Sequence, residues 1–309
     1  MDKFIEFITT NRIFPSEKAV IALGVFDGVH PGHRKVIAAA SALAAETGGR
    51  AGAVTFIPHP RQILGNANDL KLLMPESDRI AALTASGAEF VCKINFSGTV
   101  AGWDAEDFLK RLQNCGLFEL AGICVGSNWR FGRNGSGNRE LLAGFCRKNH
   151  IRFIPVEEVE DHGNIVSSTL IRKLTAAGEL DEVRRIYGDH ARISGTVKSG
   201  MHAASRDLKA PTANIELQYG VMVPDGVYAG YSDIAGKRFP AVLNIGCAPT
   251  YDVQEKRIEV HLIGFEGDLY GRMLTVALVK KLRDIRKFSS VDELKTQIAQ
   301  DIAEAQQLL

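Results

Sequence analysis

The spacing of apolar residues changes once along this 309-residue chain, near position 189. Before that point, short apolar runs alternate with longer stretches whose apolar residues recur at helical spacing. After it, short β-rich runs are separated by Gly, Pro and Asp. Because the two patterns bury apolar surface in different architectures, we predict one domain over residues 1–188 and a second over residues 189–309.

The first pattern predicts strands that alternate with helices. We expect strands at 19–25, 50–56, 90–95, 120–125 and 152–155, and helices at 34–46, 76–86, 105–115 and 139–148. Such alternation builds βαβ units around a parallel sheet that helices cover on both faces. Ligands of these α/β folds bind beyond the carboxyl ends of the strands.

The second pattern predicts a closed antiparallel β-barrel followed by one helix. The β-rich runs lie at 193–197, 226–231, 239–245, 257–263 and 273–282. Runs of this length between turn residues are typical of small barrels. Residues 290–309 then carry apolar side chains at helical spacing, so we expect an amphipathic helix capped by Ser289 or Ser290.

Charge and cysteine usage exclude several classes of protein. The chain has 37 Lys plus Arg against 36 Asp plus Glu, so no global field attracts nucleic acid or an anionic membrane. No apolar run approaches the roughly 20 residues of a membrane span. The five cysteines form no C-x-x-C pair, which predicts reduced thiols in a cytoplasmic protein. The sequence is compatible with a monomer or a homo-oligomer.

The segment G-V-F-D-G-V-H-P-G-H, residues 24–33, lies where the first predicted strand ends and a helix begins. Gly24, Gly28 and Gly32 let the backbone approach a ligand closely, and the helix N-terminus offers N–H groups to an anion. His30 and His33 can then donate hydrogen bonds to phosphate oxygens. The alternative is a Gly-rich turn with two solvated histidines.

A second segment, V-S-S-T-L-I-R, spans residues 166–172. Ser168 and Thr169 fall where a helix would start, and Arg172 follows one turn later on the same side. Hydroxyls, N-terminal amides and a guanidinium together form a clamp for pyrophosphate. Taken alone, the segment is also compatible with an ordinary capped helix.

Together these segments resemble the bacterial bifunctional riboflavin kinase/FAD synthetase family. The match extends over residues 23–288 through T-F-I-P-H-P, V-G-S-N-W-R-F-G and several later motifs. The resemblance implies a Rossmann-like nucleotidyltransferase domain that joins AMP from ATP to the phosphate of FMN, followed by a riboflavin kinase-like barrel. His30 and His33 would stabilise the ATP phosphates, and Ser168, Thr169 and Arg172 would hold the departing pyrophosphate. Other ATP-binding positions implied by the resemblance are Gly24, Phe26, Asp27 and Gly28. On the flavin side it implies Phe56, Pro58, His59 and Asn128, with Ile57 where the family usually has an acidic residue.

The β-rich half carries its own motifs. P-T-A-N, residues 211–214, puts Thr212 and Asn214 on one side of an extended chain, where their oxygens could ligate Mg²⁺ or simply form a structural turn. Glu259 lies in a β-rich run and would face either solvent or a site. The resemblance assigns Thr212 and Asn214 to the Mg²⁺–ATP site and Glu259 to general base for the riboflavin 5′-hydroxyl.

The kinase-like half departs from the family pattern in one loop. Ser205, Lys209 and Ala210 stand where two glycines and an aromatic residue are usual, while Gly264 and Ile285 replace common acidic residues. We therefore expect an FAD-forming enzyme that uses riboflavin, FMN, ATP and Mg²⁺, with a weak kinase step. The alternatives are a monofunctional FAD synthetase with an inactive barrel and a non-catalytic flavin-binding regulator.

Overall fold

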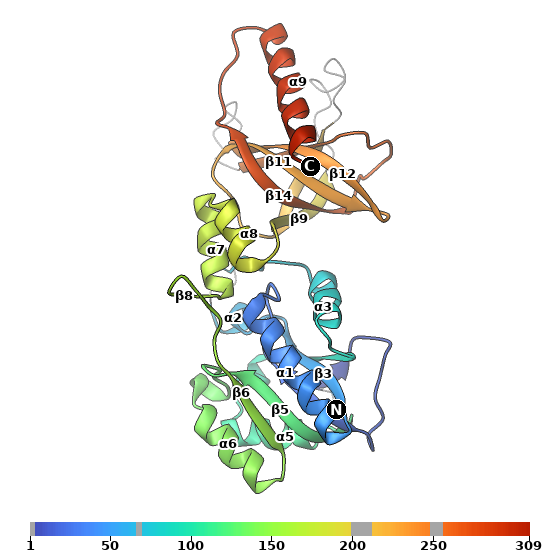
Figure 1. The fold of residues 1–309 in the computed structure, drawn as a ribbon, viewed down its shortest axis with the longest axis vertical. Coiled ribbons are helices and arrows are strands. Elements are labelled where there is room, and N and C mark those ends of the chain that lie inside the picture. Colours follow the sequence, from blue (N-terminus) through green and yellow to red (C-terminus); the bar gives the residue numbers. More distant parts are fainter. Residues whose placement is uncertain (1–3, 66–69, 199–211, 248–255) are drawn as a thin grey trace. The chain divides into compact units, whose positions relative to one another are not determined.

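The computed structural model describes residues 4–65, 70–198, 212–247 and 256–309. The chain forms two compact units, one of Met1–Leu70 with Glu76–Ser167 and one of Lys71–Pro75 with Ser168–Leu309. Figure 1 shows a sheet with flanking helices in the first unit and a barrel in the second. The expected mixed α/β and barrel architecture is confirmed.

The first unit is built on a six-stranded sheet of order β1-β4-β3-β2-β5-β6. The strands are β1 (Ile5–Phe7), β2 (Lys18–Leu23), β3 (Arg50–Ile57), β4 (Phe90–Asn95), β5 (Glu119–Gly126) and β6 (Arg152–Val156). Five of them pair in parallel, as predicted, whereas β1 adds an antiparallel edge against β4 that was not predicted. A three-residue edge strand carries too little apolar alternation to be recognised.

Helices and short turns complete this unit. They are α1 (Pro31–Thr47), α2 (Pro60–Leu64), α3 (Glu76–Ala85), α4 (Gly98–Ala101), α5 (Ala105–Gln113), α6 (Arg139–Lys148), the 3-10 turn Arg133–Gly135 and the hairpin β7 (Glu160–Asp161) with β8 (Asn164–Ile165). Five of the six residues of β2 are buried, which explains its unbroken apolar run. Gly52 lets the Phe90 ring cross its strand, because a Cβ there would lie 2.2 Å from that ring.

The second unit contains a closed six-stranded barrel of order β10-β13-β12-β11-β14-β9. Its strands are β9 (Ala191–Lys198), β10 (Ala213–Tyr219), β11 (Gly226–Ile234), β12 (Lys237–Cys247), β13 (Lys256–Leu262) and β14 (Met273–Arg283). All neighbours pair antiparallel. Strand β10, which was not predicted, begins within P-T-A-N and closes the barrel.

The described residues of the barrel unit also form the helices α7 (Ser168–Ala177), α8 (Leu180–Tyr187) and α9 (Val291–Leu308). The first two share the barrel's apolar core through Ile171, Val183 and Tyr187. The longer segment of this unit therefore begins at Ser168, before the change of apolar period at 189 on which the predicted domain division rested. Helix α9 is capped by Ser290, whose Oγ accepts a hydrogen bond from the Glu293 backbone at 3.2 Å.

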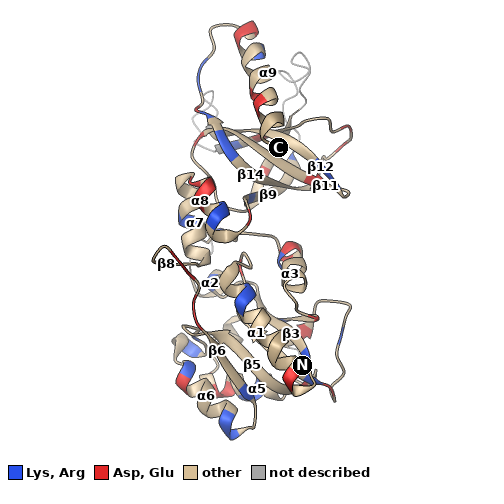
Figure 2. Cartoon of the chain, in the orientation of Figure 1, with Lys and Arg blue, Asp and Glu red and all other residues tan. Residues whose placement is uncertain are grey.

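Charged residues of both signs occur in each unit (Figure 2). Of the helices in the part of the chain that the structure describes, none combines the length and hydropathy needed to cross a bilayer.

Candidate functional site

The turn between β2 and α1 has an unusual backbone conformation. Phe26 and Val29 adopt left-handed φ values of +55° and +43°, and Gly28 lies between them at +88°. A residue with a side chain in this region costs about 1–3 kcal/mol, so the surrounding structure must impose the conformation. The Phe26 ring, 1 % exposed, packs against Gly24, where a Cβ would lie 2.9 Å from it.

The two histidines of the first motif are stacked at the start of α1. His30 is the N-cap residue of the helix, and its ring lies 3.6 Å from that of His33, at an interplanar angle of 26°. Phe26 completes the cluster. Its ring packs edge-to-face against that of His33, with ring centroids 5.2 Å apart. Among the residues that the structure describes, the buried Nδ1 of His33 has no hydrogen-bond partner.

Burial, first of all, holds the pKa of His33 well below its usual value, and the neighbouring charges of His30 and Arg79 add to this effect. The His33 ring is thus kept neutral in the first turn of α1. A helix N-terminus already favours an anion through its N–H groups and its dipole. Because the pair lies beyond the carboxyl end of β2, it occupies the position where α/β folds bind nucleotides.

The serine-rich motif begins a helix as predicted. Helix α7 starts at Ser168, Thr169 is exposed, and Arg172 lies one turn in. The Arg172 Nε donates to the Lys71 carbonyl at 2.7 Å, which fixes the root of its guanidinium within the second unit. Val166, the first residue of this motif, lies in the first unit, and its carbonyl would be 3.7 Å from a Cβ at Gly32.

The predicted flavin-side residues occupy different environments. Phe56 is 6 % exposed and packs against Phe96 and Phe108, whereas Pro58 is exposed. The His59 Nδ1 accepts from the Arg61 backbone at 3.1 Å and so caps α2. Asn128 is exposed, and its amide donates to the Glu158 carboxylate.

An aromatic cluster around Phe56 was missed from the sequence. Trp129 and Phe131 stack with centroids 4.6 Å apart, and Phe108 packs against both. The alternation of aromatics in W-R-F at 129–131, next to a predicted strand end, was the available signal. The cluster gives Phe56 a rigid, apolar surrounding.

In the barrel, the predicted metal ligand and the predicted base are brought together. Asn214 on β10 lies directly opposite Glu259 on β13, and Glu259 lies opposite Asn244 on β12. The flanking Ile215 and Ile258 are buried in the barrel core, so the polar row faces outward. Thr212 is exposed immediately before β10. Asn244 was not predicted as a site residue.

The chemistry of this donor set fits Mg²⁺. Mg²⁺ prefers oxygen ligands and is usually held by one or two protein groups together with substrate phosphates. A hydroxyl at Thr212 and an amide oxygen at Asn214 supply such oxygens, and the carboxylate of Glu259, the expected base, lies opposite Asn214. Over the described ranges, the structure contains no cluster of three or more His, Cys, Asp or Glu that could hold a metal by itself.

Of the divergent positions in this half, Ser205, Lys209 and Ala210 lie outside the described residues. Gly264 adopts φ +72° in the turn after β13, a conformation that suits glycine better than the acidic residue it replaces. The Ile285 side chain closes over Gly246, where a Cβ would lie 2.2 Å from its Cδ1.

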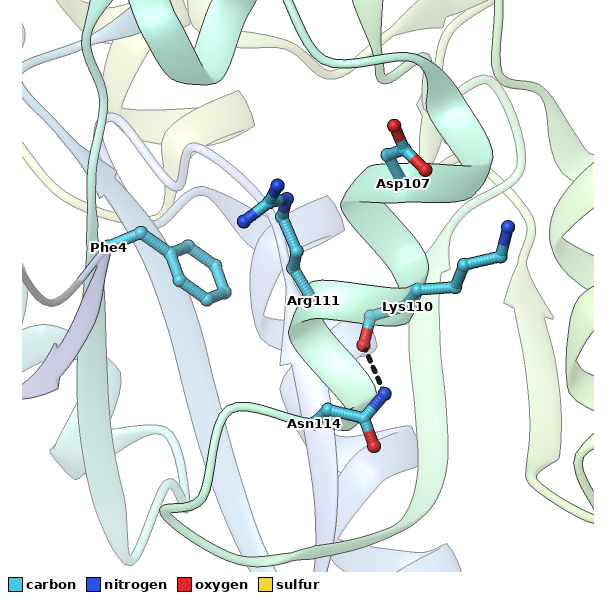
Figure 3. A pocket seen from close by; sticks show the side chains of 5 residues that line it. All are labelled: Phe4, Asp107, Lys110, Arg111 and Asn114. Atoms are coloured by element: carbon cyan, nitrogen blue, oxygen red, sulfur yellow. Dashed lines mark hydrogen bonds between the residues drawn. The ribbon is translucent and has the colours of Figure 1, made fainter. Parts of the chain in front are cut away.

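A hollow on α5 is separate from these groups (Figure 3). It is lined by Phe4, Asp107, Lys110, Arg111 and Asn114. The Arg111 guanidinium lies 4.4 Å above the Trp103 ring, Lys110 pairs with Glu106 at 3.5 Å, and Asn114 donates to its own helix at 2.9 Å. These side chains do not converge on a common ligand position.

A stacked histidine pair at the first strand–helix turn of a parallel sheet, joined in one chain to a barrel with an oxygen-rich outer row, defines a two-domain ATP-dependent transferase. The FAD synthetase family model matches residues 14–170, and the riboflavin kinase family model matches residues 187–309. The chain belongs to the bifunctional riboflavin kinase/FMN adenylyltransferase family.

Individual relatives agree with this assignment. The chain is 34 % identical over 300 residues to the bifunctional riboflavin kinase/FMN adenylyltransferase of Pseudomonas fluorescens, covering 96 % of both chains. It is 32 % identical to that of Bacillus subtilis, covering 93 % of this chain and 92 % of the relative. A crystal structure described as a macrolide-efflux protein from Streptococcus pneumoniae matches with a TM-score of 0.80 and 28 % identity, over 96 % of each chain.

Proposed function

We propose that this chain makes FAD in two ATP-dependent steps, phosphorylating riboflavin to FMN and then adenylylating FMN with release of pyrophosphate. The observation that carries the proposal is that each compact unit has its own set of phosphate-directed groups. The histidine pair lies in the half matched by the FAD synthetase family, and the Asn214–Glu259 pair lies in the half matched by the riboflavin kinase family.

For adenylyl transfer, an oxygen of the FMN phosphate attacks the α-phosphorus of ATP in line. The bond between the α-phosphorus and its bridging oxygen breaks, and pyrophosphate leaves with the electron pair. His30 and His33 donate hydrogen bonds to phosphate oxygens whose charge grows in the transition state. Ser168, Thr169 and Arg172 hold the leaving pyrophosphate. No covalent nucleophile is needed, because catalysis consists of positioning and charge stabilisation.

ATP and flavin are placed by the residues around this turn. Gly24, Phe26, Asp27 and Gly28 shape the turn against the nucleotide, and Phe56, Pro58, His59 and Asn128 shape the FMN side. Since His59 caps α2 through its Nδ1, it orders the loop rather than approaching flavin with that nitrogen. The exposure of Asn128, whose amide donates to Glu158, is compatible with a contact to the flavin.

For the kinase step, Glu259 accepts the proton of the riboflavin 5′-hydroxyl while that oxygen attacks the γ-phosphorus of ATP, and ADP leaves. Thr212 and Asn214 would hold Mg²⁺, which neutralises phosphate charge when bound. The cross-strand position of Asn214 supports this assignment, because it places an amide oxygen beside the base.

The setting of the enzyme follows from the same reasoning. We infer a cytoplasmic enzyme with reduced thiols. Burial raises the pKa of Cys92 strongly and that of Cys124 and Cys146 to about 12, which makes these thiols unreactive.

One experiment separates the bifunctional enzyme from the monofunctional alternative that Ser205 and Lys209 favour. Purified protein is incubated with ATP and Mg²⁺ plus either riboflavin or FMN, and flavins are separated by chromatography. The proposal expects FMN and FAD from riboflavin, and FAD from FMN. FAD from FMN alone would establish a monofunctional FAD synthetase, and no product from either would establish a binding protein.

A further inference from the structure

Arg79 on α3 is a buried cation that the sequence did not single out. It is 5 % exposed, in a chain whose arginines otherwise lie mainly at the surface. A buried charge is costly unless the fold uses it, so its surroundings call for an explanation. Its Nη1 donates to the Val25 carbonyl at 3.2 Å.

The Val25 carbonyl receives a second hydrogen bond from an independent element. The Thr55 Oγ1, fully buried on β3, donates to it at 2.9 Å. Val25 directly precedes Phe26, the first left-handed residue of the turn. At the other end of the turn, the Arg34 Nε donates at 2.9 Å to the carbonyl of Val29, the last residue of the turn with a left-handed φ. Both ends of the turn are therefore held by side chains.

We propose that Arg79 is a positioning residue for adenylyl transfer, which holds the turn that carries the histidine pair and sets the charge environment of that pair. This inference rests on the proposed function. Both residues hold the turn through a hydrogen bond to Val25, but only Arg79 also brings a positive charge. Comparing variants of the two residues therefore separates the effect of the hydrogen bond from the effect of the charge.

The electrostatic contribution is directed at His33. Three influences lower the pKa of His33. The largest is its burial, followed by the charges of His30, at the start of the same helix, and of Arg79 on α3. Asp27, a buried carboxylate, belongs to the same turn. With Arg79 present, a proton on His33 is disfavoured while the site is empty, and the ring stays neutral. The negative charge of an arriving phosphate then offsets the positive charge of Arg79.

The test compares Arg79→Gln with Thr55→Val. Glutamine removes the charge but keeps a polar side chain with an amide donor, and valine is nearly isosteric with threonine but removes its donor. Titration of His33 is followed by NMR in the substrate-free full chain, and FAD formation is followed against pH. Arg79→Gln should raise the pH midpoint of His33 and lower FAD formation at neutral pH about tenfold or more. Thr55→Val should leave the His33 midpoint unchanged.

Arg79→Lys keeps the charge and tests rescue. It should retain the wild-type His33 midpoint and FAD formation within about threefold of wild type. Riboflavin phosphorylation should be unchanged in all three variants. If Arg79→Gln and Thr55→Val lose FAD formation equally, and His33 titrates at the same pH in both, Arg79 is merely structural. If Arg79→Gln does not fold, a folded Arg79→Lys protein that loses tenfold or more overturns the proposal.

The His33 titration needs no substrate. If wild-type protein forms no FAD, the proposed function fails, and the midpoint still shows whether Arg79 acts on His33.

Discussion

Asn214 and Glu259 face each other directly across the antiparallel pair of β10 and β13, forty-five positions apart in the chain. Directly opposed residues place their Cβ atoms about 4.5–5.5 Å apart, so an amide and a carboxylate can act on one ligand. P-T-A-N and the β-rich run that contains Glu259 are far apart in the sequence, and the register of the barrel strands brings them together. The register also adds Asn244 on the far side of Glu259.

Glu259→Gln should lower FMN formation from riboflavin about 10²-fold or more, because glutamine keeps the size of the side chain but cannot accept the proton. Conversion of supplied FMN to FAD should continue at the wild-type rate. Chromatography of flavins from both substrates measures the two steps in one preparation. Asn244→Ala is the matched control, because Asn244 lies opposite Glu259 on the neighbouring strand. An equal loss of FMN formation in Asn244→Ala would show that the reaction needs polar side chains on this face of the barrel and not a base at Glu259.

His33→Ala should lower FAD formation about 10²-fold or more, in the range for losing a preorganised hydrogen-bond donor. His30→Ala should act similarly, since the two rings form one stacked unit. The kinase step should survive in both variants, because the barrel carries its own groups. Parallel loss of both activities would mean that the pair supports folding instead of chemistry.

His33 should also make stability depend on pH. Its pKa is lowered in the folded protein, so between that value and about 6.5, the pKa of an unfolded histidine, only the unfolded chain binds the proton. The free energy of unfolding should therefore fall as pH drops below about 6.5, by up to about 1.4 kcal/mol per pH unit, and be independent of His33 above it. Urea unfolding of wild type and His33→Gln across this window measures the difference. A parallel pair of pH curves would contradict the assignment.

Much of this fold is predictable from the sequence because the longer elements carry a clear apolar period. The predicted strand at 90–95 and helix at 139–148 match β4 and α6 residue for residue. The misses have physical causes. Strand β10 alternates imperfectly, with Ala213 and Asn214 partly buried, and it is recognisable only through its pairing with β9 and β13.

The site was predictable where chemistry is concentrated in a motif, as at His30 and His33. It was not predictable where a residue acts through tertiary contact. Arg79 has no motif of its own, and its role depends on a carbonyl 54 positions away. The capping role of His59 likewise depends on a backbone N–H that composition does not show.

Arg172→Lys should weaken ATP binding in the adenylyl-transfer step, because lysine keeps the charge but loses the planar fork that binds phosphate oxygens in pairs. The same change removes the bond from Nε to the Lys71 carbonyl, which should cost only about 1 kcal/mol of stability. Calorimetric titration with ATP and thermal unfolding separate the two effects. A large drop in melting temperature with unchanged ATP affinity would refute the pyrophosphate assignment.

Asp301 on α9 offers a test of how the terminal helix is attached to the barrel. Its carboxylate, 5 % exposed, accepts from the Arg283 guanidinium at 2.8 Å through Nη2 and at 3.0 Å through Nε, and Gln297 also donates to it. Asp301→Asn should lower the free energy of unfolding by about 3 kcal/mol, since it leaves the arginine charge without its carboxylate in a largely buried position. The double variant Arg283→Leu with Asp301→Leu should cost less than the single change, because neither charge is then buried alone. Denaturant unfolding of the wild type, Asp301→Asn and the double variant measures these differences. A double variant less stable than Asp301→Asn would show that the pair contributes more than the desolvation it requires.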